Sequence, residues 1–161
     1  MIDDLSFLKK NQKRIEKALD KALPLRNFSN ITEAIHYSVM DGGKRIRPQL
    51  MYLVADSLSL SLKDETIDAM AASGELIHCY SLIHDDLPAM DDDDLRRGKP
   101  SCHIKFGEAS AILAGDAIQP LALEIITDID DPNLSADTKI KIISIFSKAC
   151  GPFGMVEGQN R

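Results

Sequence analysis

The sequence predicts an all-α protein, and three observations lead to that prediction. Apolar residues recur at a helical spacing in one segment after another along the 161 residues. No stretch alternates apolar and polar residues in the manner of a strand with one buried face. The chain also contains no internal repeat and no low-complexity tract, which leaves one helical domain of ordinary size.

The first two expected helices are marked by apolar stripes and by the residues at their ends. A stripe runs over residues 5–22, and Pro24 ends it. Asn30 with Glu33 three residues later fits the spacing of a capping box. We therefore expect the second helix to begin at Asn30 and to continue through Val39.

Three further helices are expected after a glycine pair. Gly42 and Gly43 stop the second helix, and Pro48 suits the first turn of the next one. A long helix should span residues 63–86. The segment 110–129 also has helical periodicity, although Pro120 inside it should produce a kink.

The remaining segments are a linker and a last helix. Residues 90–105 are polar and are expected to form the linker. Ser135 suits the N-cap of a final helix that reaches Cys150, where Gly151 and Pro152 close it.

Composition excludes several classes of protein. Hydrophobic residues make up 44% of the chain and charged residues 27%, a balance typical of soluble domains. The net charge of −6 argues against a nucleic-acid partner. We expect no membrane span and no signal peptide. The three cysteines lack Cys-x-x-Cys spacing, which indicates reduced thiols and a cytoplasmic location.

Aspartates supply six of the ten residues 85–94. Because like charges this close repel one another, the alternative to a binding site is an acidic loop in solvent. Two features favour a binding site. The run begins where an apolar helix ends, so Asp85 and Asp86 should lie at the edge of the core. Arg96 and Arg97 follow almost at once.

The chemistry of this segment fits a magnesium–phosphate site. Magnesium prefers oxygen ligands, commonly one or two carboxylates, with phosphate oxygens and water completing an octahedron. Arginine binds phosphate with a planar fork of donors. The other interpretation is a set of surface ion pairs, each worth about 0–1 kcal/mol.

A second basic segment lies between two expected helices at residues 42–48 (GGKRIRP). Its glycines let the backbone pass close to a ligand, and the next helix would point its N-terminal amides outward. Alone, the pattern is more typical of a turn with solvated cations, and it lacks the spacing of a P-loop. Together with the aspartate segment, it indicates two diphosphates held in one cavity.

These segments resemble the trans-isoprenyl diphosphate synthase family, and bacterial farnesyl diphosphate synthases most of all. Residues 85–100 (DDLPAMDDDDLRRGKP) resemble the first aspartate-rich motif, and residues 42–48 the isopentenyl diphosphate segment. Residues 78–84 (HCYSLIH) match the stretch before that motif. Residues 113–117 (LAGDA) and 158–159 (GQ) are similar to further landmarks. The resemblance implies an isoprenoid (terpenoid) synthase helical bundle.

The resemblance also implies roles for single residues. Asp85 and Asp91 would ligate Mg²⁺, with Asp86 close by, and Arg96 would bind the allylic diphosphate. Isopentenyl diphosphate would be bound by a second set: Lys44, Arg47, His78 and Arg97. Without the resemblance, His78 would be interpreted as a packed helix residue.

A farnesyl product is implied by the residues before the aspartates. Tyr80, five residues before Asp85, and its neighbour Ser81 would form the floor of the chain-length pocket. An aromatic residue there, with two extra residues inside the aspartate motif, resembles bacterial farnesyl synthases. For His36, His84 and His103 we expect packing or surface roles.

The reaction implied is the condensation of isopentenyl diphosphate with dimethylallyl or geranyl diphosphate. Magnesium and arginine would neutralise the departing diphosphate, and the isopentenyl double bond would attack the allylic cation. The resulting cation would then lose a proton to the departed diphosphate. An apolar bundle would keep water away from the allylic cation.

The chain departs from the family in its length. Members are nearly twice as long and carry a second aspartate-rich motif that these 161 residues lack. Residues 1–161 would then be the N-terminal part of a single polyprenyl synthase domain, a truncated bundle with little activity alone. Its uncovered apolar faces should cause aggregation or pairing as a homodimer.

Two other classes of function stay open. A non-catalytic binding or regulatory subunit of the same fold would keep the helices without the reaction. A helical metal-dependent phosphohydrolase would need repeated His-Asp pairs, and only His84-Asp85 is present.

Overall fold

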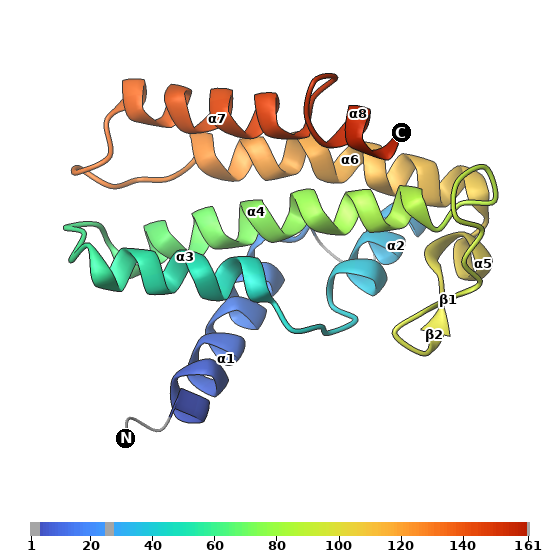
Figure 1. Cartoon of the computed structure of the whole chain (residues 1–161), viewed down its shortest axis with the longest axis horizontal. Coiled ribbons are helices and arrows are strands. Elements are labelled where there is room, and N and C mark those ends of the chain that lie inside the picture. The colour runs from blue at the N-terminus through green and yellow to red at the C-terminus, as the bar shows by residue number, and fades with distance from the viewer. Residues whose placement is uncertain (1–3, 25–27, 161) are drawn as a thin grey trace.

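The computed structural model describes residues 4–24 and 28–160. Within them the protein is built almost entirely of helices, as the periodicity predicts (Figure 1). The helices are α1 (Asp4–Ala22), α2 (Asn30–Val39), α3 (Ile46–Ser57), α4 (Asp64–Asp85), α5 (Cys102–Phe106), α6 (Glu108–Thr127), α7 (Ala136–Cys150) and α8 (Met155–Gln159). The fold class is therefore confirmed.

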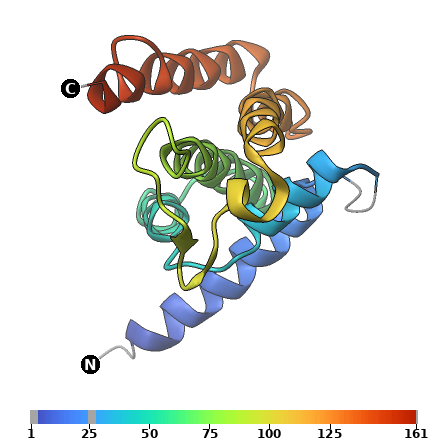
Figure 2. The same ribbon diagram turned by 90° about the vertical axis from the view of Figure 1, so that its right-hand side faces the viewer.

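Helices α4 and α6 form the centre of the fold, and the contact between them is the most extensive in the molecule. Helices α1 and α3 pack on α4, while α2 and α5 pack on α6. Figure 2 shows α4 and α6 nearly end-on, with α1 and α7 on opposite sides of the pair. The core between these helices contains Leu19, Val39, Leu76 and Ile118, which are all inaccessible to solvent.

The N-cap of α2 lies one residue before the expected position. Ser29 accepts a hydrogen bond from the backbone amide of Thr32, and the Thr32 hydroxyl accepts one from the Ser29 amide. The capping box is therefore Ser29–Thr32, and the assignment to Asn30 and Glu33 is wrong. A threonine hydroxyl at the third helical position can accept the same hydrogen bond as a glutamate carboxylate. The spacing rule therefore could not decide between Ser29–Thr32 and Asn30–Glu33.

Helix α6 continues through Pro120 without a break. By length and apolar composition it is the one helix among the described residues that could also span a membrane. The core helix of a soluble protein meets the same requirement, and α6 packs against α2, α4, α5 and α7.

Residues 90–105, expected to form a polar linker, contain two short strands and most of α5. Strands β1 (Leu95–Arg96) and β2 (Lys99–Pro100) pair antiparallel, and Arg97 and Gly98 form the turn with positive φ angles. We call residues 95–100 the hairpin. Strands of two residues are too short to show an alternating pattern, so the sequence could not reveal them.

Apolar side chains are exposed to solvent on several helices, α7 and α3 among them. Helix α7 contributes no buried residue, and its Ile140 and Ile145 are both about two-thirds exposed. On α3, Leu50 and Val54 are each more than half exposed. The expected uncovered apolar faces are therefore present on both helices.

Candidate functional site

The aspartate segment folds back on the C-terminal end of α4. The backbone amide of Asp91 donates to the carbonyl of Asp85 at 2.8 Å, and that of Asp93 donates to Asp86 at 3.2 Å. Asp92 takes a left-handed conformation in this turn, with φ of 56°. The fold-back gathers four carboxylates within one small region, as the sequence predicts for the edge of the core.

Negative charge is crowded at Asp85. Partial burial raises the pKa of this carboxyl, and the carboxylates of Asp91 and Asp86 raise it further. The site also lies at the C-terminal end of a 22-residue helix, where the helix dipole disfavours anions. A bound cation would relieve this repulsion.

The carboxylate of Asp86 is paired with the guanidinium of Arg96. The carboxylate is buried, and the Arg96 guanidinium donates to it from both Nε and Nη2, with the Nε donor at 3.1 Å from Oδ1. The same guanidinium reaches Asp93 at 3.4 Å. Arg96 therefore lies beside the carboxylates, and its guanidinium is bonded to Asp86 there.

The hairpin contacts the glycine turn at residues 41–43. Nη1 of Arg97 donates to the carbonyl of Gly42, and Nζ of Lys99 pairs with the carboxylate of Asp41. A Cβ atom at Gly43 would lie 2.7 Å from Cζ of Arg97. The backbone at Gly43 thus passes close to a guanidinium of the same chain, where the sequence suggested that it passes close to a ligand.

Two of the predicted isopentenyl diphosphate residues, Arg47 and Arg97, lie close enough to a third, His78, for their charges to act on it. Lys44 and Arg47 are exposed, while His78 is half-buried. Burial lowers the pKa of His78, and the nearby charges of Arg47 and Arg97 lower it further. The fold therefore brings three segments, residues 44–47, 78 and 97, into one basic region.

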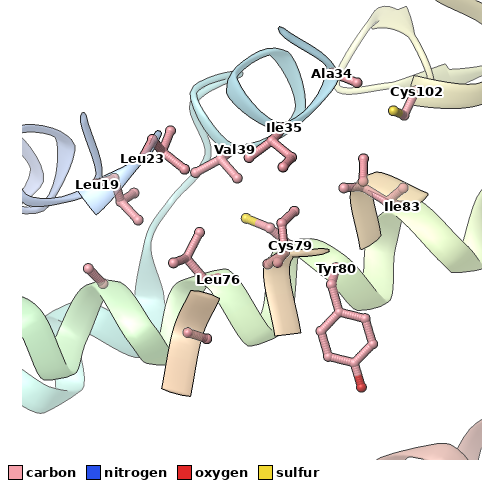
Figure 3. Packing of buried hydrophobic residues seen from close by; sticks show 14 of the residues in the cluster. Leu19, Leu23, Ala34, Ile35, Val39, Leu76, Cys79, Tyr80, Ile83 and Cys102 are labelled. Atoms are coloured by element: carbon pink, nitrogen blue, oxygen red, sulfur yellow. The ribbon is translucent and has the colours of Figure 1, made fainter. Parts of the chain in front are cut away.

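Tyr80 and Ser81 follow His78 on α4. Figure 3 shows the Tyr80 side chain projecting away from the side of α4 on which Leu76 and Cys79 face Val39. The ring is buried and stacks edge-to-face on His84, with 5.9 Å between ring centroids. Ser81 uses its hydroxyl to bond the carbonyl of His78 at 2.9 Å. Their role in chain length stays a prediction.

The donor set fits magnesium in combination with a phosphate ligand. Among the residues that the structure describes, no group of three or more His, Cys, Asp or Glu is placed to hold a metal alone. Magnesium commonly takes only one or two carboxylates and completes its shell with phosphate and water. Asp85 and Asp91 supply two such carboxylates, and Arg96 supplies a phosphate donor beside them.

Four residues with a structural role were not predicted from the sequence: Arg45, Glu16, Glu75 and Gly115. Arg45 is fully buried and pairs with Glu16 and Glu75. Gly115 provides the space that the His84 ring occupies. A charged residue at position 75, within the apolar stripe of α4, was the signal that could have revealed the first of these.

The chain is similar to known proteins over most of its length. Residues 28–160 match the family model described as polyprenyl synthetase. Farnesyl diphosphate synthase of Escherichia coli K12 is 50% identical over 149 residues, which cover 91% of this chain and 49% of that protein. Farnesyl diphosphate synthase of Geobacillus stearothermophilus is 45% identical over 155 residues, which cover 95% of this chain and 51% of that protein.

A solved structure of a geranyltransferase from Legionella pneumophila superimposes with a TM-score of 0.88 at 47% identity. The superposition covers 95% of this chain and 53% of the Legionella chain. The chain thus spans about half the length of the relatives it matches. With the family model, the fold and the gathered motifs in agreement, the chain belongs to the polyprenyl synthetase family.

Proposed function

We propose that this chain forms part of a prenyltransferase that condenses isopentenyl diphosphate with dimethylallyl or geranyl diphosphate to give farnesyl diphosphate. Residues 1–161 would be the N-terminal part of one polyprenyl synthase domain. The names of its relatives, farnesyl diphosphate synthases at 45–52% identity, support the product. A soluble, cytoplasmic homodimer is the proposed working form, and the exposed apolar faces support self-association.

One observation carries the proposal: the hairpin joins the two phosphate-competent segments. Its first arginine, Arg96, lies among the carboxylates of the aspartate segment. Its second arginine, Arg97, bonds the carbonyl of Gly42 beside Lys44. Two diphosphates bound at these segments would lie on either side of one hairpin, as a condensation between two diphosphates requires.

The residues on the carboxylate side would bind the allylic substrate. Asp85 and Asp91 would hold Mg²⁺, which supplies charge neutralisation to the leaving diphosphate when bound. Arg96, held in place by Asp86, would donate to the phosphate oxygens. Because Asp86 is buried and already paired, its proposed part is to orient Arg96.

The residues on the basic side would bind isopentenyl diphosphate. Lys44 and Arg47 are exposed, and the charges of Arg47 and Arg97 both act on the half-buried His78. Burial and the nearby arginines lower the pKa of His78, which favours the neutral imidazole in the ligand-free chain, and its proposed contribution is a hydrogen bond to the diphosphate. Binding of its diphosphate group would hold the isopentenyl double bond so that it faces the allylic carbon.

Calorimetry with a bisphosphonate and magnesium tests the carboxylate side. Asp85→Ala and Asp91→Ala should each weaken binding at least tenfold, because the ligand loses its metal-mediated contact. Asp56→Ala is the matched control, since Asp56 is an exposed aspartate near the end of another helix, α3. Equal affinity in wild type, Asp85→Ala and Asp91→Ala would overturn the proposed site.

The 161-residue polypeptide alone should have little or no condensing activity. Loss of each group of preorganised charges commonly costs about 10²–10³ in rate, and a second aspartate-rich motif is absent from this sequence. Incubation with geranyl and isopentenyl diphosphates and magnesium measures the rate. Farnesyl diphosphate formed as fast as by a longer relative would contradict this expectation. Binding of both ligands without turnover in any longer form would favour a non-catalytic subunit.

A further inference from the structure

Arg45 lies between the two cations expected to bind substrate, yet its side chain faces the interior. The side chain of Arg45 is 0% exposed, whereas Lys44 and Arg47 on either side are exposed. The backbone of Arg45 is left-handed, with φ of 47° and ψ of 43°, immediately before α3. The turn therefore separates three neighbouring cations into one buried and two exposed.

Three separate elements hold the buried guanidinium. Nε donates to Glu16 Oε1 of α1 at 2.9 Å, and Nη1 donates to Glu75 Oε1 of α4 at 3.0 Å. Nη2 donates to the carbonyl of Val39, the last residue of α2, at 2.7 Å. One side chain thus connects α1, α2 and α4 to the start of α3.

Burying Arg45 and Glu75 costs free energy, and removing Arg45 would leave the carboxylate of Glu75 buried without this partner. A buried charge is tolerated only when it is paired and hydrogen-bonded, and a non-glycine residue in the left-handed region carries backbone strain. Glu75 is itself buried, with 2% of its side chain exposed, and lies one helical turn before His78. The cation and its two carboxylates therefore fix both the turn and the segment of α4 that faces it.

We propose that Arg45, with Glu16 and Glu75, is a positioning residue that holds Lys44 and Arg47 in the orientation that binds isopentenyl diphosphate. This inference rests on the proposed function. Arg45 contacts no ligand in this role, because its donors are used by Glu16, Glu75 and Val39. Arg45 therefore affects the binding of isopentenyl diphosphate and not that of the allylic diphosphate, because the aspartate segment is held by separate contacts.

Two ligands distinguish positioning from a general loss of structure. The affinities of isopentenyl diphosphate and of a bisphosphonate, both with magnesium, are measured by calorimetry on the whole chain. Arg45→Lys keeps the charge but cannot satisfy two carboxylates and a carbonyl together. We expect it to weaken isopentenyl diphosphate at least tenfold while changing bisphosphonate affinity less than threefold.

Glu16→Gln is the second variant, in case Arg45→Lys does not fold. Glu16 is partly exposed, so its neutralisation loosens the guanidinium without leaving a fully buried charge alone. It should weaken isopentenyl diphosphate threefold or more, again with little effect on the bisphosphonate. Unchanged affinity for isopentenyl diphosphate in these variants, or an equal loss of both ligands, overturns the positioning role.

Lys44→Ala and Arg47→Ala separate this inference from the proposed function. If these two variants bind isopentenyl diphosphate as wild type does, the proposed basic site is wrong and the role of Arg45 fails with it. If they lose binding while Arg45→Lys and Glu16→Gln do not, the basic site stands and only the positioning role fails.

Discussion

The imidazole of His84 fills the space that a side chain at Gly115 would need. A Cβ atom at position 115 would lie 2.2 Å from Nε2 of His84. The same nitrogen lies 3.1 Å from the carbonyl of Ile112. The glycine on α6 therefore lets the last turn of α4, which carries Asp85, pack closely against α6.

We expect the effect of Gly115→Ala to change sign with the residue at position 84. In wild type the new methyl group displaces the imidazole, and we expect a loss of about 1–3 kcal/mol in the free energy of unfolding. In His84→Ala the clash is gone, and Ala should stabilise the helix by about 1 kcal/mol relative to Gly. Urea denaturation of the four proteins measures both effects. Gly158→Ala, with open space around it, should be neutral or stabilising in both backgrounds.

Asp131 should make the stability depend on pH. Its carboxylate accepts from Thr66 Oγ1 at 2.7 Å and from the Lys63 amide at 2.8 Å, and so caps the start of α4. These hydrogen bonds lower its pKa. A lowered pKa gives stability that is fully present above the ordinary carboxyl pKa of about 3.9 and is lost as the pH falls through the folded-state value.

Asp131→Asn should therefore melt at a lower temperature than wild type at pH 7, and the difference should shrink in strong acid. Thermal denaturation followed by circular dichroism at several pH values measures this. Asp128→Asn, a nearby exposed aspartate at the end of α6, is the control. A constant difference across the pH range would show that the carboxylate charge is not the cause.

Gly43→Ala should weaken isopentenyl diphosphate more than a comparable glycine substitution. Both Gly42 and Gly43 have positive φ angles, so alanine is strained at either position. Only at Gly43 would the methyl group meet the Arg97 guanidinium. We expect Gly43→Ala to lose about tenfold in affinity, the size of one charge-assisted hydrogen bond.

Gly42→Ala is the matched control for that experiment, because it shares the strain and has no atom within 4 Å of the added Cβ. Similar affinity losses in the two variants would assign the effect to backbone strain alone.

Tyr80→Ala should lengthen the product in an active enzyme that carries this sequence. The buried ring projects from α4 toward the side away from Val39, and its removal would deepen any pocket there. Chromatography should then show products longer than farnesyl diphosphate. Tyr80→Phe keeps the ring and should keep the farnesyl product. An unchanged product profile in Tyr80→Ala would remove Tyr80 from the chain-length role.

Most helices could be predicted because their signals are local. The long helix was expected at residues 63–86 and spans Asp64–Asp85, since an apolar stripe of that length is rarely ambiguous. Ser135 caps α7 as expected, with its hydroxyl accepting from Thr138. The cap of α2 was misplaced by one residue because Ser29 and Asn30 are both good N-caps, and only the hydrogen bonds decide between them.

The residue types of the candidate site indicated which side chains would lie near one another, whereas their individual contacts could not be predicted. Aspartates beside arginines indicated a phosphate–metal region, and the structure places Asp85, Asp91 and Arg96 together at the end of α4. The pairing of Arg45 with Glu16 and Glu75 could not be predicted, because the two glutamates lie 29 and 30 positions from Arg45 in the sequence. Nothing in three neighbouring basic residues shows which one turns inward.

The contacts of Arg97 and Lys99 with residues 41–43 have a consequence for cooperativity between the two proposed substrates. A ligand that binds better when the hairpin lies against the turn increases the population of that arrangement. Linkage requires the effect to be reciprocal, so each diphosphate would raise the affinity for the other by the same factor. Lys99→Ala would then reduce this mutual gain while leaving the groups proposed to hold each ligand in place. The hairpin would act as the element through which the first substrate prepares the site for the second.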